Sequence, residues 1–223
     1  MPVEIADLEA VSTALLRALP KLSIEEQRLG LALYRQLARG QPVRLENVAA
    51  AVDLSAQAVA TLANRDPLRA LIYRDDRDRV VGFAGLAVLP MHYRFAADGR
   101  QLYTWCAWDS LFLPELLGKR AVVESACPET GTVIRASVAP DRIDHVEPAG
   151  AAMSFLLPDA AVLRTNATNV VTSFCHYIFF LASAEAGATW TARHQGTFVL
   201  TVDQAFELAK RANATTFSAA LKV

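Results

Sequence analysis

The sequence predicts an α+β fold, in which a helical N-terminal part is followed by a β-rich mixed sheet with flanking helices. Three observations predict it. Apolar residues recur at helical spacing through residue 64, short apolar runs separated by turn residues follow, and the last part is again helical. With 223 residues and a hydrophobic fraction of 53%, the chain can bury a sizeable core.

Four helices are predicted at the N-terminal end. The second has Ser23 as its N-cap and Gly40 as its C-terminal stop, and the fourth begins after the N-cap Ser55. Their expected ranges are 7–19, 25–38, 44–52 and 55–64.

A β-hairpin is predicted next, because apolar residues 71–73 and 80–83 flank the charged turn 74–79. Small helices followed by a hairpin are the layout of a winged helix, which raises DNA binding as a hypothesis. The charges oppose it, since residues 1–86 hold 11 basic and 11 acidic residues and the helix that would read DNA, 55–64, has no basic residue. We therefore predict a winged-helix-like domain at 1–86 that does not read DNA, and a second domain at 87–223.

The second domain is predicted to contain most of the strands. An Asp-Gly turn at 98–99 connects two of them, 143–147 and 151–157 are expected to pair, and the apolar run 170–181 is expected to be a central strand. The expected strands are 85–89, 93–96, 102–104, 121–126, 132–138, 143–147, 151–157 and 170–181.

Three helices are predicted within the second domain. One covers about 104–111, is broken at Pro114 and ends at Gly118. The others are 188–194 and 203–212, the latter with Thr201 and Gln204 placed as a capping box.

Charge and cysteine content limit the functional classes. The net charge of −1 gives no general attraction to nucleic acid or to an anionic membrane. The three cysteines form no C-x-x-C pair and the four histidines show no zinc-ligand spacing, so we expect reduced thiols and no structural zinc. Acidic residues near the N-terminus argue against a secretory signal, and the run 170–184 is short for a membrane span. We expect a cytoplasmic protein without a membrane segment.

The stretch 102–109 contains the most suggestive residues. On a helix from about 104 to 111, Cys106 and Asp109 would share one face and could act on one ligand. A thiol near a helix N-terminus also tends towards thiolate. From spacing alone, packing explains the pair at least as well, and Trp105 and Trp108 are core residues in that interpretation.

Sequence spacing alone does not place a catalytic partner beside Cys175. If 170–181 is a strand, Cys175 and His176 point to opposite faces and do not form a catalytic dyad. Taken by itself, Cys175 is best interpreted as a small buried apolar residue.

Four separated motifs together resemble one enzyme family. Their order and approximate spacing are similar to those of the organomercurial (alkylmercury) lyases, over residues from about 29 to 213. The motifs are WCAWD at 105–109, VEPAG at 146–150, SFC at 173–175 and HQG at 194–196.

The resemblance implies functions for three residues. By position, Cys106 and Cys175 resemble the mercury-binding cysteines of the family, and Asp109 resembles its proton-handling carboxylate. Soft mercury(II) prefers thiolate sulfur, and a carboxylic acid can deliver the proton that a departing carbon needs. Cys127 resembles a noncatalytic cysteine of the family, and we assign it a structural role.

The same resemblance implies the reactants and partners. The substrate is an organomercurial, and the products are a hydrocarbon and Hg(II). No cofactor is expected, because mercury is substrate and product and cellular thiols are co-reactants. A mercuric reductase that accepts Hg(II) is a further implied partner, and neither nucleic acid nor a membrane is expected.

Three alternatives remain. A mercury-binding module could hold the metal on two thiols without cleaving carbon. A cysteine hydrolase could pair Cys106 with His145 or His194, although no Gly-rich oxyanion loop lies beside the thiol. A winged-helix transcriptional regulator is the third alternative, and the neutral charge of residues 1–86 disfavours it.

Overall fold

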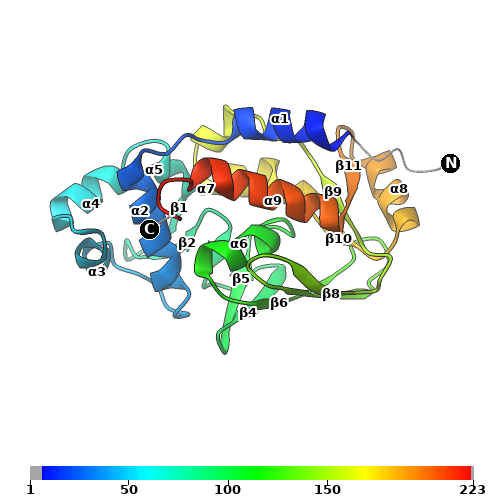
Figure 1. Ribbon diagram of the computed structural model, residues 1–223, viewed down its shortest axis with the longest axis horizontal. Helices are drawn as coiled ribbons and strands as arrows, with labels where there is room; N and C mark the ends of the chain where they lie inside the picture. Colours follow the sequence, from blue (N-terminus) through cyan, green and yellow to red (C-terminus); the bar gives the residue numbers. More distant parts are fainter. Residues whose placement is uncertain (1–6, 222–223) are drawn as a thin grey trace.

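The computed structural model describes residues 7–221 and confirms the α+β fold (Figure 1). The predicted N-caps are correct: Ser23 and Glu26 form a capping box, and the Ser55 side chain accepts a hydrogen bond from the Ala58 N–H. The N-terminal helices are α1 (Leu8–Ala18), α2 (Ile24–Leu37), α3 (Glu46–Ala49), the 3₁₀ helix η1 (Ala50–Val52), α4 (Ala56–Ala63) and α5 (Leu68–Leu71). Residues 1–6, which include part of the acidic N-terminal stretch, lie outside the described residues, as do 222–223.

An antiparallel sheet of eight strands forms the centre of the molecule, in the order β1-β2-β3-β5-β4-β6-β7-β8. The two predicted hairpins are present, one between β1 and β2 and one at Asp98 and Gly99, which both have positive φ. The strands are β1 (Ile72–Arg74), β2 (Val80–Phe83), β3 (Leu86–Ala87), β4 (Tyr93–Ala97), β5 (Arg100–Thr104), β6 (Ala121–Ala126), β7 (Val133–Val138) and β8 (Ile143–Glu147).

A second sheet, four further α-helices and two 3₁₀ helices, η2 and η3, complete the fold of residues 7–221. The sheet has three strands in the order β10-β9-β11, so 143–147 and 151–157 do not pair as predicted: β8 pairs with β7 in the first sheet, and β9 belongs to the second. The remaining elements are α6 (Asp109–Leu117), β9 (Ala152–Phe155), η2 (Val162–Arg164), α7 (Ala167–Ser173), η3 (Cys175–Tyr177), β10 (Phe180–Leu181), α8 (Ala184–Arg193), β11 (Phe198–Thr201) and α9 (Val202–Thr216).

Helix α9 connects the parts of the molecule. It packs against α1 and α6, and Figure 1 shows α1 and α9 running side by side above the large sheet. The predicted capping box of Thr201 and Gln204 starts this helix. Among residues 7–221, no helix combines the length and hydropathy that a membrane crossing requires.

The boundary predicted between residues 86 and 87 passes through the large sheet. Strand β2 of the N-terminal part pairs with β3, with Gly82 opposite Ala87. Helix α2 also packs against β2 and α6. The division into domains at 1–86 and 87–223 therefore stays a prediction about sequence organisation, while one continuous sheet joins the two parts.

Two predicted elements around the candidate residues were wrong. Residues 170–181 do not form one strand, because α7, η3 and β10 replace it. Asn166 caps α7, and the buried side chains of 167, 170 and 174 follow helical spacing, which the apolar run concealed. The helix predicted at 104–111 begins only at Asp109, continues through Pro114 and ends at Gly118, which has φ +62°.

Candidate active site

The turn between β5 and α6 holds Cys106 and Asp109 together. The Cys106 N–H donates a hydrogen bond of 2.6 Å to the Asp109 carboxyl group. The Thr104 hydroxyl donates to the Cys106 carbonyl at 2.8 Å, and the Ser110 hydroxyl donates to the Ala107 carbonyl at 2.6 Å. The pair thus lies close together because of this hydrogen-bonded turn, and not because both residues occupy one helical face.

Cys175 approaches the same turn from η3. The Ile178 carbonyl, just after η3, accepts hydrogen bonds from the Ala107 N–H at 3.2 Å and from the Tyr93 hydroxyl at 2.9 Å. These bonds fix the segment that carries Cys175 relative to the segment that carries Cys106. His176 is exposed whereas Cys175 is buried, and the two lie on the 3₁₀ helix η3 and not on a strand.

The three candidate residues form one buried group. One ligand atom from each of Cys106, Asp109 and Cys175 lies within 4.8 Å of the others, and their exposed fractions are 0%, 5% and 3%. Two thiolates that share a metal ion stand at most two metal–sulfur bonds apart, roughly 4.6 Å by analogy with zinc thiolates. The separation therefore suits one soft metal ion held by two sulfurs beside a carboxyl group.

Burial has the largest influence on the pKa values of Cys106 and Asp109. It raises the pKa of the Asp109 carboxyl group to about 7, although hydrogen bonds from Cys106 oppose the rise. It also raises the pKa of the Cys106 thiol well above its ordinary value. The expectation that a helix N-terminus favours the Cys106 thiolate is therefore wrong, because Cys106 precedes the helix and desolvation raises its pKa.

Opposing interactions act on the pKa of the Cys175 thiol. Hydrogen bonding between the two thiols lowers it, but burial and the nearby Asp109 carboxylate outweigh that effect and raise the net pKa. The resting group therefore carries its protons on the two thiols, and the carboxyl group is the member that titrates near neutral pH.

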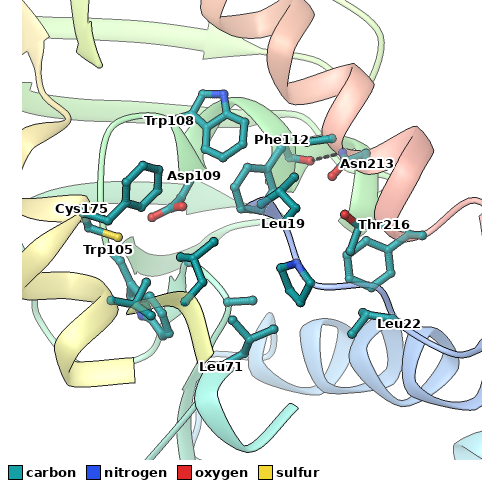
Figure 2. Close-up of a pocket in the computed structure, with 18 of the residues that line it drawn as sticks. Leu19, Leu22, Leu71, Trp105, Trp108, Asp109, Phe112, Cys175, Asn213 and Thr216 are labelled. Carbon is teal, nitrogen blue, oxygen red and sulfur yellow. Dashed lines mark hydrogen bonds between the residues drawn. The ribbon is translucent and has the colours of Figure 1, made fainter. Parts of the chain in front are cut away.

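An apolar cavity of about 110 Å³ opens onto this group (Figure 2). Asp109 and Cys175 are part of its wall, and Figure 2 shows the Asp109 carboxyl group between Trp105 and Trp108. The opposite wall comes from the α1–α2 connection, α2 and α9. Its side chains include Leu19, Leu22, Tyr34, Asn213, Thr216 and Phe217.

Sequence reasoning did not identify several of these residues. Gly85 and Tyr34 line the cavity, and Tyr93 anchors the Cys175 segment, yet none belongs to a motif that the sequence analysis used. Gly85 carried one usable signal, because a glycine inside a strand pattern often marks a close backbone approach. The α9 residues carried none, since their contacts with the site span about a hundred positions.

The remaining cysteine and histidines lie outside the group. Cys127 is buried in the turn between β6 and β7, and its structural role stays a prediction. His145 lies exposed on β8, and the His194 ring stacks on Trp190 with ring centroids 3.7 Å apart. Within residues 7–221 no hydrogen bond joins a histidine to Cys106, which disfavours the cysteine hydrolase.

Comparisons with known proteins find similar sequences over most of the chain. A family model described as alkylmercury lyase (MerB) matches residues 86–213. The chain is 39% identical to an alkylmercury lyase of Streptomyces lividans over 180 residues, which is 80% of this chain and 78% of that protein. It is 38% identical to one of Pseudomonas putida over 180 residues, covering 81% of this chain and 80% of that protein.

A solved structure shares the fold. A crystal structure described as the mercury-bound form of MerB2 superposes with a TM-score of 0.72 at 23% identity, covering 94% of this chain and 98% of the other. At that identity the likeness supports the fold and does not assign residues.

Proposed function

This chain belongs to the alkylmercury lyase family, and from that premise we propose that Cys106, Cys175 and Asp109 carry out its reaction. The family consists of enzymes that cleave the carbon–mercury bond of organomercurials. The observation that supports the residue assignment is the burial of two thiols and one carboxyl group within 4.8 Å, at the wall of an apolar cavity. The cavity would receive the organic group while the sulfurs receive the mercury.

The proposed reaction begins with thiol exchange. One cysteine thiol replaces the thiolate that the organomercurial carries, and its proton leaves with the displaced thiol. Cys175 is the better candidate for this step, because it lines the cavity and Cys106 does not. Replacing Cys175 by Ser should then prevent stoichiometric capture of the organomercurial, whereas Cys106→Ser should still capture it; the opposite result would reverse the order.

Carbon–mercury cleavage follows in the proposal. The second thiol adds to mercury and gives its proton to Asp109, which passes the proton to carbon. The electron pair of the carbon–mercury bond stays with carbon, so the products are a hydrocarbon and Hg(II) bound to two thiolates. Mercury stays in the +2 state, and therefore the step needs neither an oxidant nor a reductant.

Cellular thiols and the cytoplasm fit this scheme. Exogenous thiols would deliver the substrate and remove Hg(II), so we propose them as co-reactants and propose no cofactor. A mercuric reductase that takes over the metal is part of the same proposal. All three cysteines are free in the structure, which suits a reducing cytoplasm.

Product analysis tests the proposal against a mercury-binding module. With excess cysteine present, methylmercury and phenylmercury should yield methane and benzene in the headspace. A binding module would retain mercury and release neither hydrocarbon. The buried carboxyl group and the apolar cavity favour the lyase, because a storage site on two thiols requires neither.

A further inference from the structure

We propose that Gly85 is a positioning residue for the Asp109 carboxyl group, and that Tyr34 supports the turn that contains Gly85. This inference rests on the proposed role of Asp109 as the proton carrier. It also gives the N-terminal helices a part in the reaction, because Tyr34 belongs to α2.

The backbone of Gly85 lies directly against the carboxyl group. A Cβ atom at this position would be 2.7 Å from both Cγ and Oδ1 of Asp109 and 2.9 Å from its Cβ. Real Cβ atoms essentially never approach other heavy atoms within 3.0 Å. Asp109 has a short side chain that is only 5% exposed, so it cannot give way without leaving its place. Only glycine leaves room for the carboxyl group here.

The turn around Gly85 is held from three sides. The Gly85 carbonyl accepts a hydrogen bond of 2.9 Å from the Trp105 N–H, next to Cys106. The Ala84 N–H donates to the Leu71 carbonyl at 2.9 Å, and the Ala84 carbonyl accepts a bond of 2.8 Å from the Tyr34 hydroxyl. Both turn residues have positive φ, +36° at Ala84 and +98° at Gly85, a conformation that such contacts must maintain.

The carboxyl group is consequently confined between two backbone segments. The Cys106 N–H donates a hydrogen bond to Oδ2, and Oδ1 lies 2.7 Å from the position that a Cβ atom of residue 85 would occupy. Two thiols can capture mercury without the carboxyl group, but proton transfer requires it at a defined place. Displacing it should therefore slow hydrocarbon release and leave mercury capture intact, a separation that general destabilisation would not produce.

Replacing Gly85 by Ala tests the proposal in the full chain. We expect single-turnover release of benzene from phenylmercury to fall about 100-fold, the scale of a misplaced catalytic group. Binding of one Hg(II) per chain, followed by thiolate–mercury absorbance, should not change. Gly99→Ala is the matched control, because Gly99 has φ +71° and open space around its Cβ position, and its release rate should equal the parent rate.

Two further variants make the result decisive. Tyr34→Phe removes one hydroxyl and should slow release about fivefold, as expected for one lost hydrogen bond. In an Asp109→Asn background, Gly85→Ala should cause no further loss if Gly85 acts through the carboxyl group. A folded Gly85→Ala protein with the parent rate would overturn the proposal, as would an additive loss in the double variant. If Gly85→Ala does not fold, a parent rate in Tyr34→Phe overturns it.

The same set separates this inference from the proposed function. If Asp109→Asn itself releases benzene at the parent rate, the role of Asp109 fails and the positioning role fails with it. If Asp109→Asn is slow and Gly85→Ala is not, only the inference about Gly85 fails.

Discussion

The two walls of the cavity are built on different principles. One wall carries Cys106, Asp109 and Cys175, buried polar groups whose segments are fixed by directional hydrogen bonds to backbone atoms. The opposite wall consists of mainly apolar side chains from the α1–α2 connection, α2 and α9, held mainly by packing. Tyr34 and Asn213 are its exceptions, because each donates a hydrogen bond to a backbone carbonyl. Directional contacts fix atoms to fractions of an ångström, whereas packing excludes water and tolerates adjustment. We expect the first wall to determine the chemistry and the apolar side chains of the second to determine affinity, while Tyr34 acts on the chemistry through the Gly85 turn.

The largest effect should come from the thiols. Replacing Cys106 or Cys175 by Ser should reduce hydrocarbon release from phenylmercury to that of a protein-free sample, because serine oxygen is a poor ligand for soft mercury(II). Gas chromatography of the headspace measures this. Cys127→Ser is the control, since Cys127 lies outside the buried group, and it should keep the parent rate. Retained release in either active-site variant would contradict the assignment.

The carboxyl group should matter for cleavage and not for capture. Asp109→Asn should still bind one Hg(II) on two thiols, but single-turnover hydrocarbon release should fall by about 100-fold or more, the usual contribution of a general acid–base group. Mercury stoichiometry and headspace analysis on the same sample separate the two steps. An unchanged release rate would remove Asp109 from the mechanism.

Cys106, Asp109 and Cys175 also show how much of the structure can be predicted from the sequence. The caps at Ser23, Ser55 and Thr201 and the Asp98-Gly99 turn were predictable because each depends on a few neighbouring residues. The proximity of Cys106 and Asp109 was predicted too, although a turn and not a helical face creates it. Cys175 could be connected with them only through the family resemblance, because apolar periodicity did not separate α7 and η3 from a strand.

The opposite wall could not be predicted in this way. Its residues come from the α1–α2 connection, from α2 and from α9 and its C-terminal end, and nothing local in Leu22 or Phe217 indicates which cavity they face. Gly85 could be predicted in part. A glycine in a strand pattern signals a close backbone approach, but the group that approaches it, the Asp109 carboxyl group, is 24 positions away in the sequence. Contacts between distant segments depend on the packing of the whole chain, which a single sequence does not display.

The pH dependence of cleavage should follow Asp109. Because the carboxyl group must be ionised before it can take the thiol proton, and its pKa is raised to about 7, the single-turnover rate should increase by up to tenfold per pH unit below about pH 7 and level off above it. Asp109→Asn should lack this increase. A parent profile that is flat from pH 5 to 8 would contradict the role of the carboxyl group as proton acceptor.

The same ionisation should reduce stability. The folded-state pKa of Asp109 lies above the value of 3.8 of an unperturbed carboxyl group, so between these pH values the folded chain holds a proton that the unfolded chain has lost. The free energy of unfolding contributed by this group should therefore decrease as pH rises from about 4 to 7. Urea unfolding of the parent should show this decrease relative to Asp109→Asn, and parallel curves would contradict it.

The smallest effect on the reaction should come from the apolar wall. Leu22→Ala removes a side chain that is 9% exposed from the connection between α1 and α2, and it enlarges the cavity. We expect KM for phenylmercury to rise several-fold because apolar contact with the ring is lost, at about 0.8 kcal/mol per buried methylene, while kcat stays within twofold. Leu45→Ala is the control: Leu45 is 7% exposed and lies outside the cavity, so that variant should lose stability without a change in KM. A fall in kcat as large as that of Asp109→Asn would show that the apolar side chains of this wall also position the reacting atoms, and the distinction between the two walls would then fail.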